Sequence, residues 1–421
     1  MSLLWLLALG AVRADIFEDV VMRLEITGDT ELWDALFKGA RQLETVVGDD
    51  KVTWSEGPLW TNGSLLFTDT ITAKLHRYDP ATRTLSTLAE CAGGVCADAP
   101  GEEWRAEPGA NGLALWSPAG GGAPTVLACQ HGTARVVALD TDAVAGGRPR
   151  ALSAGAHAVP IATHGARGRR LNGPNDLAVA GEWAYFTDPV YAFLELERFE
   201  DLPYLDEAVR ERGAGVTGIY RARLRAPGAS SPPPAAELLD ASLSRPNGIA
   251  VLPPDRGAGA SARERLVVSE CCQGEHNAAC AQGVGRWRVY ELAGGDGPDD
   301  GAGAAATQLR GLANIELEVA DAPPGCADGL AAWPTGRVGG VHGPLGEEHE
   351  LLLATCPGGL CVVSVTAGRV LARARGARTS NVAFGSDGYV YITGLARVWR
   401  LPYDSHAKLP RASSTRPTPE L

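Results

Sequence analysis

The chain has 421 residues, of which 45% are apolar, so it is globular and long enough to bury a large core. Its 50 acidic and 38 basic side chains give a net charge of −12, which argues against nucleic-acid binding because that function requires a basic stripe. Long helical periodicities are scarce, whereas short alternations of Val, Ile, Leu and Thr are common, which favours an all-β fold.

The N-terminal sequence MSLLWLLALGAVRAD contains an apolar run at 3–12. This run is shorter than the roughly 20 residues that span a bilayer, so no membrane span is predicted. The Val-Arg-Ala sequence before Asp15 resembles a cleavage site, and we expect 1–14 to be the signal peptide of a secreted or secretory-pathway protein. No Lys or Arg precedes the run, which leaves an N-terminal strand of a cytoplasmic protein as the alternative.

From position 56 onward the chain repeats one pattern six times. A polar residue leads into a short apolar strand, a turn follows, and a second strand ends in TD, CQ, SE, TC or TG before a third strand. EGPLWTNGSLLFTDTITAKLHRYDP and NDLAVAGEWAYFTDPVY illustrate the pattern. The six leading residues are Glu56, Asn111, Asn175, Asn247, Asp328 and Asn381.

Six units of three or four strands predict a six-bladed β-propeller, because radial repetition lets short strands bury both faces. We assign residues 43–401 to one such domain. A solenoid is the alternative, but it requires shorter, more uniform repeats and capped ends. Closure of the ring predicts that the strand at 43–47 pairs, as an outer strand, with the last blade near 389–400, which removes an exposed edge.

Four segments fall outside this pattern. The low-complexity stretches at 226–236 and 293–306 are expected to be surface insertions. The segment 193–215 has apolar residues at helical spacing and is expected to form either a lid near the channel or a surface helix. The tail at 404–421 is rich in Pro, Ser and Thr and is expected to be disordered.

The nine cysteines suggest disulfides that close loops in an oxidising compartment. Zinc is disfavoured, since CAGGVC and CPGGLC have C-x4-C spacing and no Cys/His quartet accompanies them. The odd count leaves at least one thiol free, Cys129 or Cys326. The expected pairs are Cys91–Cys96, Cys356–Cys361, and one among Cys271, Cys272 and Cys280.

The six leading residues all carry a side-chain oxygen, and in a propeller they would meet at one mouth of the central channel. Turn preference explains an Asn or Asp before Gly at any single position. It does not explain why all six agree, or why one is Glu. Oxygen ligands with two carboxylates suit a hard divalent cation, so we expect a metal site at this mouth.

The motifs EGPLW, LNGPNDLAV, FTDPVY, RPNGIAV and CADGL resemble the gluconolactonase / regucalcin-like family, also called the senescence-marker-protein group, across 43–401. This family includes diisopropyl-fluorophosphatase-type propellers. The resemblance implies a six-bladed propeller that binds a divalent cation, usually Ca²⁺. Family members mostly have PDG where this chain has Ala327-Asp328-Gly329. Transferred by motif, the implied metal ligands are Glu56, Asn175, Asn247 and Asp328.

The same resemblance implies a metal-dependent hydrolase that opens a sugar-type or other small lactone, with no obligate protein partner. The cation would polarise the carbonyl, and Asp328 would act as general base or as nucleophile. His131 in CQHGTARV is a weaker catalytic candidate, and Asn111 and Asn381 are candidates for substrate binding. The alternatives are a calcium-binding or interaction propeller without turnover, and a phosphotriesterase-like hydrolase of the same fold.

Overall fold

The structure is a computed structural model. It describes the following residues: 22–48, 50–97, 107–118, 121–139, 150–151, 158–165, 168–193, 216–225, 233–253, 263–271, 285–292, 309–316, 326–334, 338–342 and 348–407. The predicted signal peptide at 1–14, nearly all of the predicted lid or surface helix, and most of the predicted disordered tail lie outside these ranges.

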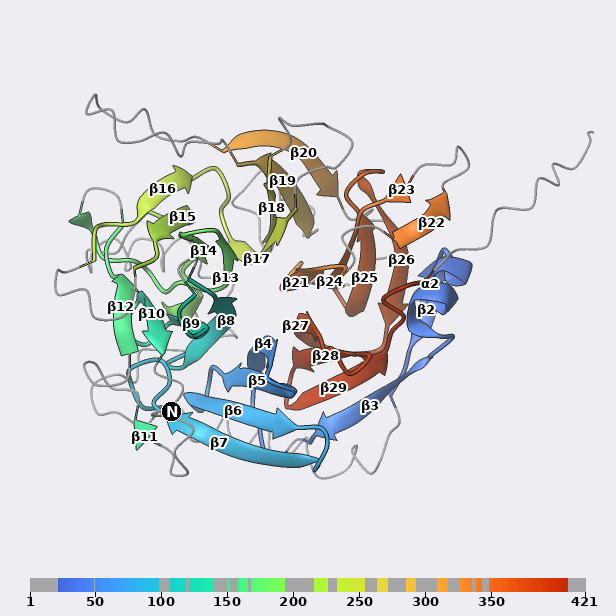
Figure 1. The fold of residues 1–421 in the computed structure, drawn as a ribbon, viewed down its shortest axis with the longest axis horizontal. Helices are drawn as coiled ribbons and strands as arrows, with labels where there is room; N and C mark the ends of the chain where they lie inside the picture. The colour runs from blue at the N-terminus through green and yellow to red at the C-terminus, as the bar shows by residue number, and fades with distance from the viewer. Residues whose placement is uncertain are drawn as a thin grey trace, which may run out of the picture.

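Six four-stranded antiparallel blades surround a central channel, which confirms the all-β, six-bladed propeller (Figure 1). The innermost strands are β4 (Ser55–Thr61), β8 (Ala110–Trp116), β13 (Leu177–Ala180), β17 (Pro246–Leu252), β21 (Leu330–Ala332) and β27 (Thr379–Phe384). The second strands are β5 (Ser64–Asp69), β9 (Thr125–Gln130), β14 (Trp183–Asp188), β18 (Arg265–Glu270), β24 (Leu351–Cys356) and β28 (Tyr389–Gly394).

The two outer strands of each blade complete the sheets. The third strands are β6 (Lys74–Asp79), β10 (Arg135–Leu139), β15 (Gly218–Arg223), β19 (Arg286–Glu291), β25 (Gly359–Ser364) and β29 (Arg397–Pro402). The fourth strands are β7 (Thr84–Glu90), β12 (Ala158–Ala162), β16 (Glu237–Asp240), β20 (Arg310–Glu316), β26 (Arg369–Arg375) and β3 (Gln42–Val47). Short additions are β1 (Met22–Arg23), β2 (Glu25–Gly28), β11 (Arg150–Ala151), and the hairpin of β22 (Val338–His342) and β23 (Glu348–His349).

Burial of both strand faces explains why these short apolar segments form blades. Every residue of β5, β24 and β25 is buried, because each sheet packs face to face against its neighbours. The turn between β4 and β5 uses Asn62 and Gly63 with φ of 49° and 72°, as a type I′ hairpin requires.

The ring closes between the two ends of the chain. β3 pairs antiparallel with β29, so the predicted pairing of 43–47 with the last blade is confirmed. A bidentate ion pair reinforces it, since Arg400 Nε and Nη2 donate to the two Glu44 carboxylate oxygens at 2.9 and 2.7 Å. In Figure 1 the blue N-terminal strands lie directly against the red C-terminal ones.

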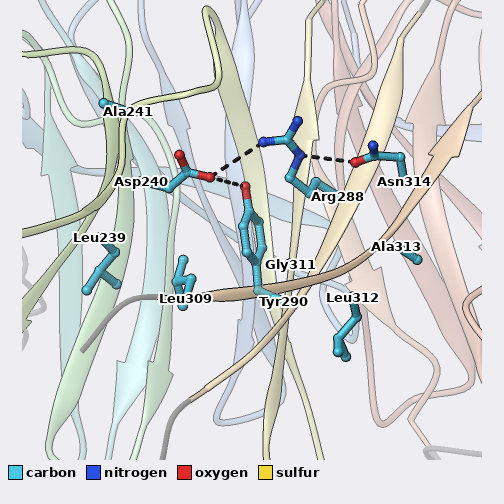
Figure 2. A pocket seen from close by; sticks show the side chains of 10 residues that line it. All are labelled: Leu239, Asp240, Ala241, Arg288, Tyr290, Leu309, Gly311, Leu312, Ala313 and Asn314. Carbon is cyan, nitrogen blue, oxygen red and sulfur yellow. Dashed lines mark hydrogen bonds and ion pairs between the residues drawn. The ribbon is translucent and has the colours of Figure 1, made fainter. Parts of the chain in front are cut away.

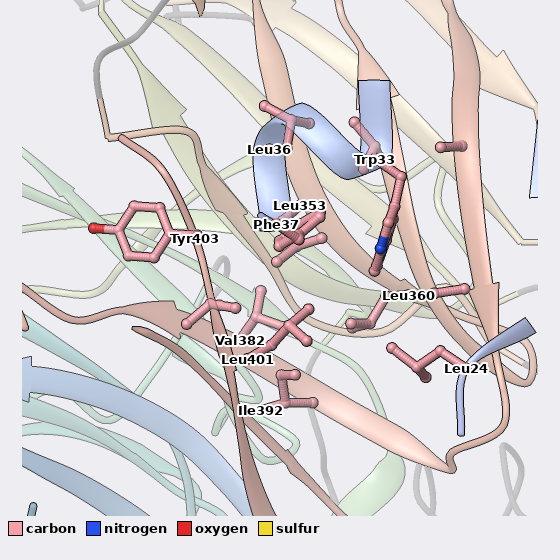
Figure 3. Packing of buried hydrophobic residues seen from close by; sticks show 14 of the residues in the cluster. Leu24, Trp33, Leu36, Phe37, Leu353, Leu360, Val382, Ile392, Leu401 and Tyr403 are labelled. Atoms are coloured by element: carbon pink, nitrogen blue, oxygen red, sulfur yellow. The ribbon is translucent and has the colours of Figure 1, made fainter. Parts of the chain in front are cut away.

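A short helix, α2 (Thr30–Phe37), joins β2 to β3 and covers the seam between the last two blades. Its N-terminus is capped by Asp29, whose Oδ1 accepts from Leu32 N at 2.9 Å. Trp33 and Phe37 are fully buried in the same apolar cluster as Trp333, and Figure 3 shows Trp33, Leu36 and Phe37 directed toward the strands of these blades. The N-terminal segment therefore binds both blades, with β2 on the edge of β26 and β3 on the edge of β29.

Hydroxyl groups near the ends of the second strands connect neighbouring blades. Four of them donate to a backbone carbonyl at the start of the next inner strand: Thr68 to Asn111 (2.9 Å), Thr187 to Asn247 (2.6 Å), Ser269 to Asp328 (2.5 Å) and Thr355 to Ser380 (2.9 Å). The corresponding position of β9 is Cys129, which is buried and unbonded.

Three disulfides lie within the described residues. Cys91–Cys96 and Cys356–Cys361 form as predicted. The pairing expected within 271–280 is wrong for Cys271, which bonds to Cys326. The fold brings Cys326, just before β21, against the end of β18, a contact between blades that spacing along the chain cannot reveal. Cys272 and Cys280 lie outside the described residues.

Candidate active site

Acidic residues at the ends of the second strands hold the loops that enter the inner strands. Their carboxylates accept hydrogen bonds from the backbone N–H groups that lie two or three residues before a leading residue. The contacts are Asp69 with Thr53 N (2.8 Å), Asp188 with Asn172 N (2.9 Å) and Gly173 N (2.9 Å), and Glu270 with Ser244 N (2.8 Å). These acids therefore have a structural task, and they fix where Glu56, Asn175 and Asn247 stand.

The structure brings the six leading residues together around the channel. The inner strands contact one another in the order β4, β8, β13, β17, β21 and β27, and β27 contacts β4 again. The glycine after a leading residue permits this close approach: a Cβ on Gly112 would collide with Asp176 Oδ1, and one on Gly329 would collide with Asn381 Cγ. Glu56, Asn111, Asn175, Asn247 and Asn381 are all buried.

The carboxylates of Glu56, Asp176 and Asp328 gather at this mouth. Burial raises the pKa of Glu56 well above its usual value, and Asp328, Asp176 and Glu107 raise it further. Burial followed by the charges of Asp176 and Glu107 does the same to the pKa of Asp328. Burial raises the pKa of Asp176 to about 6. Within the described part of the chain, no Lys or Arg forms an ion pair with Glu56, Asp176 or Asp328.

These side chains form a donor set that suits a hard cation. They offer carboxylate and amide oxygens, and mutual repulsion between buried acids is relieved when a divalent ion binds. Among the described residues, however, no group of three or more His, Cys, Asp or Glu side chains is arranged to hold a metal ion. The predicted set contains only two such residues, Glu56 and Asp328, so the metal centre remains a proposal.

The amides at the mouth differ in what they contact. The Asn247 side chain hydrogen-bonds Asp328, which lowers the pKa of that carboxyl against the opposite effect of burial. Asn381 Nδ2 donates to Asp176 Oδ2 at 3.3 Å across the channel, and its Oδ1 accepts from Val382 N at 2.8 Å. Both polar atoms of the Asn381 side chain are thus engaged within the protein, whereas the Asn111 side chain forms no such bridge to another described residue.

Three residues of the mouth were not found from the sequence. Asp176 directly follows Asn175 in the PND motif, and its place beside a leading residue was the available signal. Glu107 precedes β8 and belongs to no repeat, so no pattern marks it. Tyr191, in the short 3-10 turn Tyr191–Phe193, is buried, and its pKa is raised by burial and then by the charge of Asp328.

His131, which was predicted as a weaker catalytic candidate, is fully buried with its Nδ1 2.9 Å from Glu107 Oε2.

A separate groove of about 700 Å³ lies on the rim, away from the channel, between the outer strands of the third and fourth blades. Figure 2 shows Asp240, Tyr290, Arg288 and Asn314 on one side of it and Leu239, Leu309 and Leu312 on the other. Tyr290 Oη donates to Asp240 Oδ2 at 2.7 Å and Arg288 Nε donates to Asn314 Oδ1 at 3.0 Å. These polar groups satisfy one another, which indicates a seam between blades rather than a reaction site.

No protein-family model matches the chain. A curated gluconolactonase from Zymomonas mobilis subsp. mobilis is 28% identical over 232 residues, which are 54% of this chain and 54% of that protein, so the match spans about half the length of the relative.

No helix in the described part of this chain is long and apolar enough to cross a membrane.

Solved structures show the same fold at lower identity. A gluconolactonase from Xanthomonas campestris aligns with a TM-score of 0.56 and 20% identity over 93% of this chain and 99% of that one. A second structure, also named for a gluconolactonase, aligns with a TM-score of 0.52 and 19% identity over 90% of this chain and 98% of that one.

Proposed function

We propose, from the confirmed resemblance of this chain to the gluconolactonase / regucalcin-like family, that it is a divalent-cation-dependent lactone hydrolase. The observation that carries the proposal is the group of carboxylates Glu56, Asp176 and Asp328 at one channel mouth, which form no ion pair with a Lys or Arg among the residues that the structure describes. A scaffold has no need of such an arrangement, because buried like charges destabilise the folded chain.

In this proposal Glu56, Asn175, Asn247 and Asp328 hold the cation, with Ca²⁺ preferred for an all-oxygen donor set. The bound cation supplies Lewis acidity toward the lactone carbonyl. Asp328 accepts the proton of the attacking water or attacks the carbonyl itself, and its hydrogen bond with Asn247 fixes the direction of its carboxylate. Asn111 contacts the substrate, while Asn381 supports Asp176 instead.

Two other functions use the same mouth. A calcium-binding propeller without turnover would bind the cation and hydrolyse nothing, and a phosphotriesterase-like enzyme would cleave phosphoesters in place of lactones. Each predicts a different outcome of a single panel experiment.

The test measures hydrolysis of aldono-, acyl-homoserine and aryl lactones and of an aryl phosphotriester, with EDTA and with added Ca²⁺, Mg²⁺ or Mn²⁺. We expect at least one lactone to be hydrolysed, the activity to disappear with EDTA, and Ca²⁺ to restore it. Full activity in EDTA would remove the metal from the proposal. Calcium binding measured by calorimetry without hydrolysis of any ester would favour the binding protein.

We also propose that the protein folds in an oxidising, secretory compartment. The disulfides Cys91–Cys96, Cys271–Cys326 and Cys356–Cys361 support this location, since reducing compartments keep such thiols free. Peptide mapping of the natural protein without reductant should find these three bonds, and finding all six thiols free would contradict the proposal.

A further inference from the structure

The hairpin turn between β4 and β5 carries a motif that the strand pattern does not require. Asn62, Gly63 and Ser64 form an Asn-x-Ser sequence, the acceptor sequence for N-linked glycosylation. A type I′ turn explains Asn62 and Gly63, but it has no need of a hydroxyl at the next position. Of all the asparagines in the chain, only Asn62 is followed two residues later by Ser or Thr.

The turn has room for a bulky group. Asn62 and Gly63 are both exposed, and a Cβ built on Gly63 meets no atom within 4 Å. The Asn62 side chain forms no hydrogen bond or ion pair with any other residue that the structure describes. An oligosaccharide on Asn62 would therefore extend into solvent and displace no contact of the fold, as a surface glycan requires.

The same turn lies far from the candidate active site. β4 begins beside Glu56 at the channel mouth and ends at Thr61, so Asn62 stands at the opposite end of the blade. At about 3.3 Å per residue, the strand separates Glu56 from Asn62 by about 20 Å. Trp60 Nε1 donates to Ser386 Oγ at 2.9 Å, which places the turn beside the turn that joins β27 to β28. A glycan here leaves the mouth open.

The folded chain covers the third position of the motif. Ser and Thr share only their hydroxyl, so an enzyme that accepts either residue must reach that group. Ser64 is 3% exposed, and its Oγ accepts hydrogen bonds from Arg77 Nε at 3.1 Å and Arg77 Nη2 at 3.0 Å. Arg77 belongs to β6, which pairs with β5. The motif is thus complete only before β6 joins the blade.

We propose that Asn62 is an N-glycosylation site, modified on the nascent chain before β6 pairs with β5. The co-reactant is a lipid-linked oligosaccharyl diphosphate. Asn62 Nδ2 forms a bond to the anomeric carbon of the first sugar, and the bond from that carbon to the diphosphate oxygen breaks. The lipid diphosphate leaves with the electron pair, and one Nδ2 proton passes to a base of the transferase. This inference rests on the proposed secretory location.

The test produces the full chain in a eukaryotic secretory host and maps its peptides after peptide-N-glycosidase digestion in heavy-oxygen water. Removal of a glycan turns Asn62 into Asp with one heavy oxygen, which distinguishes it from earlier deamidation in ordinary water. We expect this label on wild type and on Ser64→Thr, and its loss in Asn62→Gln and Ser64→Ala. The matched control is Asn314→Gln, which changes an exposed Asn without the motif and should keep the label.

A second measurement tests the timing. Purified protein that folded without a glycan is offered to the transferase with its lipid-linked donor, and it should stay unmodified because Arg77 covers Ser64. Modification of the folded protein would overturn the proposed order of events. Calcium binding and lactone hydrolysis by Asn62→Gln should match those of wild type, since the turn lies away from the mouth.

A chain preceded by a foreign secretory signal separates this inference from the proposed location. A glycan on that chain, with none on the chain that has its own N-terminus, would refute the location and support the site. Absence of the label at Asn62 from both chains would overturn the inference, whatever the disulfide mapping finds.

Discussion

At the scale of single residues, variants of Asp328 and Asn175 distinguish a loss of metal binding from a loss of catalysis. Asp328→Asn keeps an oxygen of similar size but removes a negative charge and a proton acceptor, whereas Asn175→Ala removes an oxygen only. We expect Asp328→Asn to lose about 10²- to 10⁴-fold in kcat even at saturating Ca²⁺. Asn175→Ala should instead need a higher Ca²⁺ concentration for hydrolysis and should recover at least part of its activity when Ca²⁺ is in excess.

The measurement is lactone hydrolysis by each variant across a calcium titration, with metal affinity determined by calorimetry. Full recovery of Asp328→Asn at high Ca²⁺ would reduce Asp328 to a ligand, and the proton acceptor would then have to be another buried group such as Asp176.

At the residue level, the sequence indicated positions around the channel where a repeat marked the residue, while the roles of these residues stay predictions. The six leading residues are recognisable because each starts a strand of the same type, and the structure gathers them at one place. Glu107 could not be found in this way, since it lies between β7 and β8 and belongs to no repeat. The Cys271–Cys326 bond escaped for a similar reason, because it joins two blades.

At the scale of elements, the loop 91–96 offers a test of how a distant disulfide supports the site. Replacing Cys91 and Cys96 by Ser leaves the loop free to move away from Pro108 and Gly132, so Glu107 and His131 lose their backing. We expect KM for the hydrolysed lactone to rise several-fold, because Gly93 of this loop packs against Pro108 and Gly109, which lead into Asn111. The matched control replaces Cys356 and Cys361, which close a loop of the same length at a hairpin of the fifth blade.

Lactone kinetics and thermal unfolding of both double variants check this expectation. Both variants should lose stability, since each loses a cross-link of the unfolded chain, but only the first should change KM. A KM change of the same size in the control would show that the effect is one of general stability.

The strands were predictable as elements, and the helix α2 was missed. Alternating apolar residues between turn signals marked the blades, as the Asn62-Gly63 turn illustrates. The helix also left signals, with Asp29 as its cap, apolar residues at helical spacing, and Gly39 just after its end. It precedes the first repeat, where the strand pattern gave no reason to look for a helix.

At the scale of the whole molecule, closure depends on the N-terminal segment. Removing residues 22–47 would expose the edges of β26 and β29. It would also remove Trp33 and Phe37 from the apolar cluster around Trp333. We expect such a chain to unfold at a much lower temperature and to self-associate through its open edges.

Thermal unfolding and sedimentation check this, with removal of 408–421 as the control. A synthetic peptide of residues 22–47 added in excess should restore part of the lost stability by mass action. A shortened chain that unfolds at the temperature of the intact protein would contradict this account of closure.

The contact of Glu44 with Arg400, 356 positions later in the chain, also affects how the protein folds during its synthesis. At 5–20 residues per second, the ribosome needs roughly 20 to 70 s to deliver the partner of a strand that emerged at the outset. Throughout that interval residues 44–47 lack the strand that they pair with in the closed ring. Two nascent chains on one polysome can exchange this strand during that interval, each closing the other's ring, so an interlocked dimer is the misassembly that late closure permits.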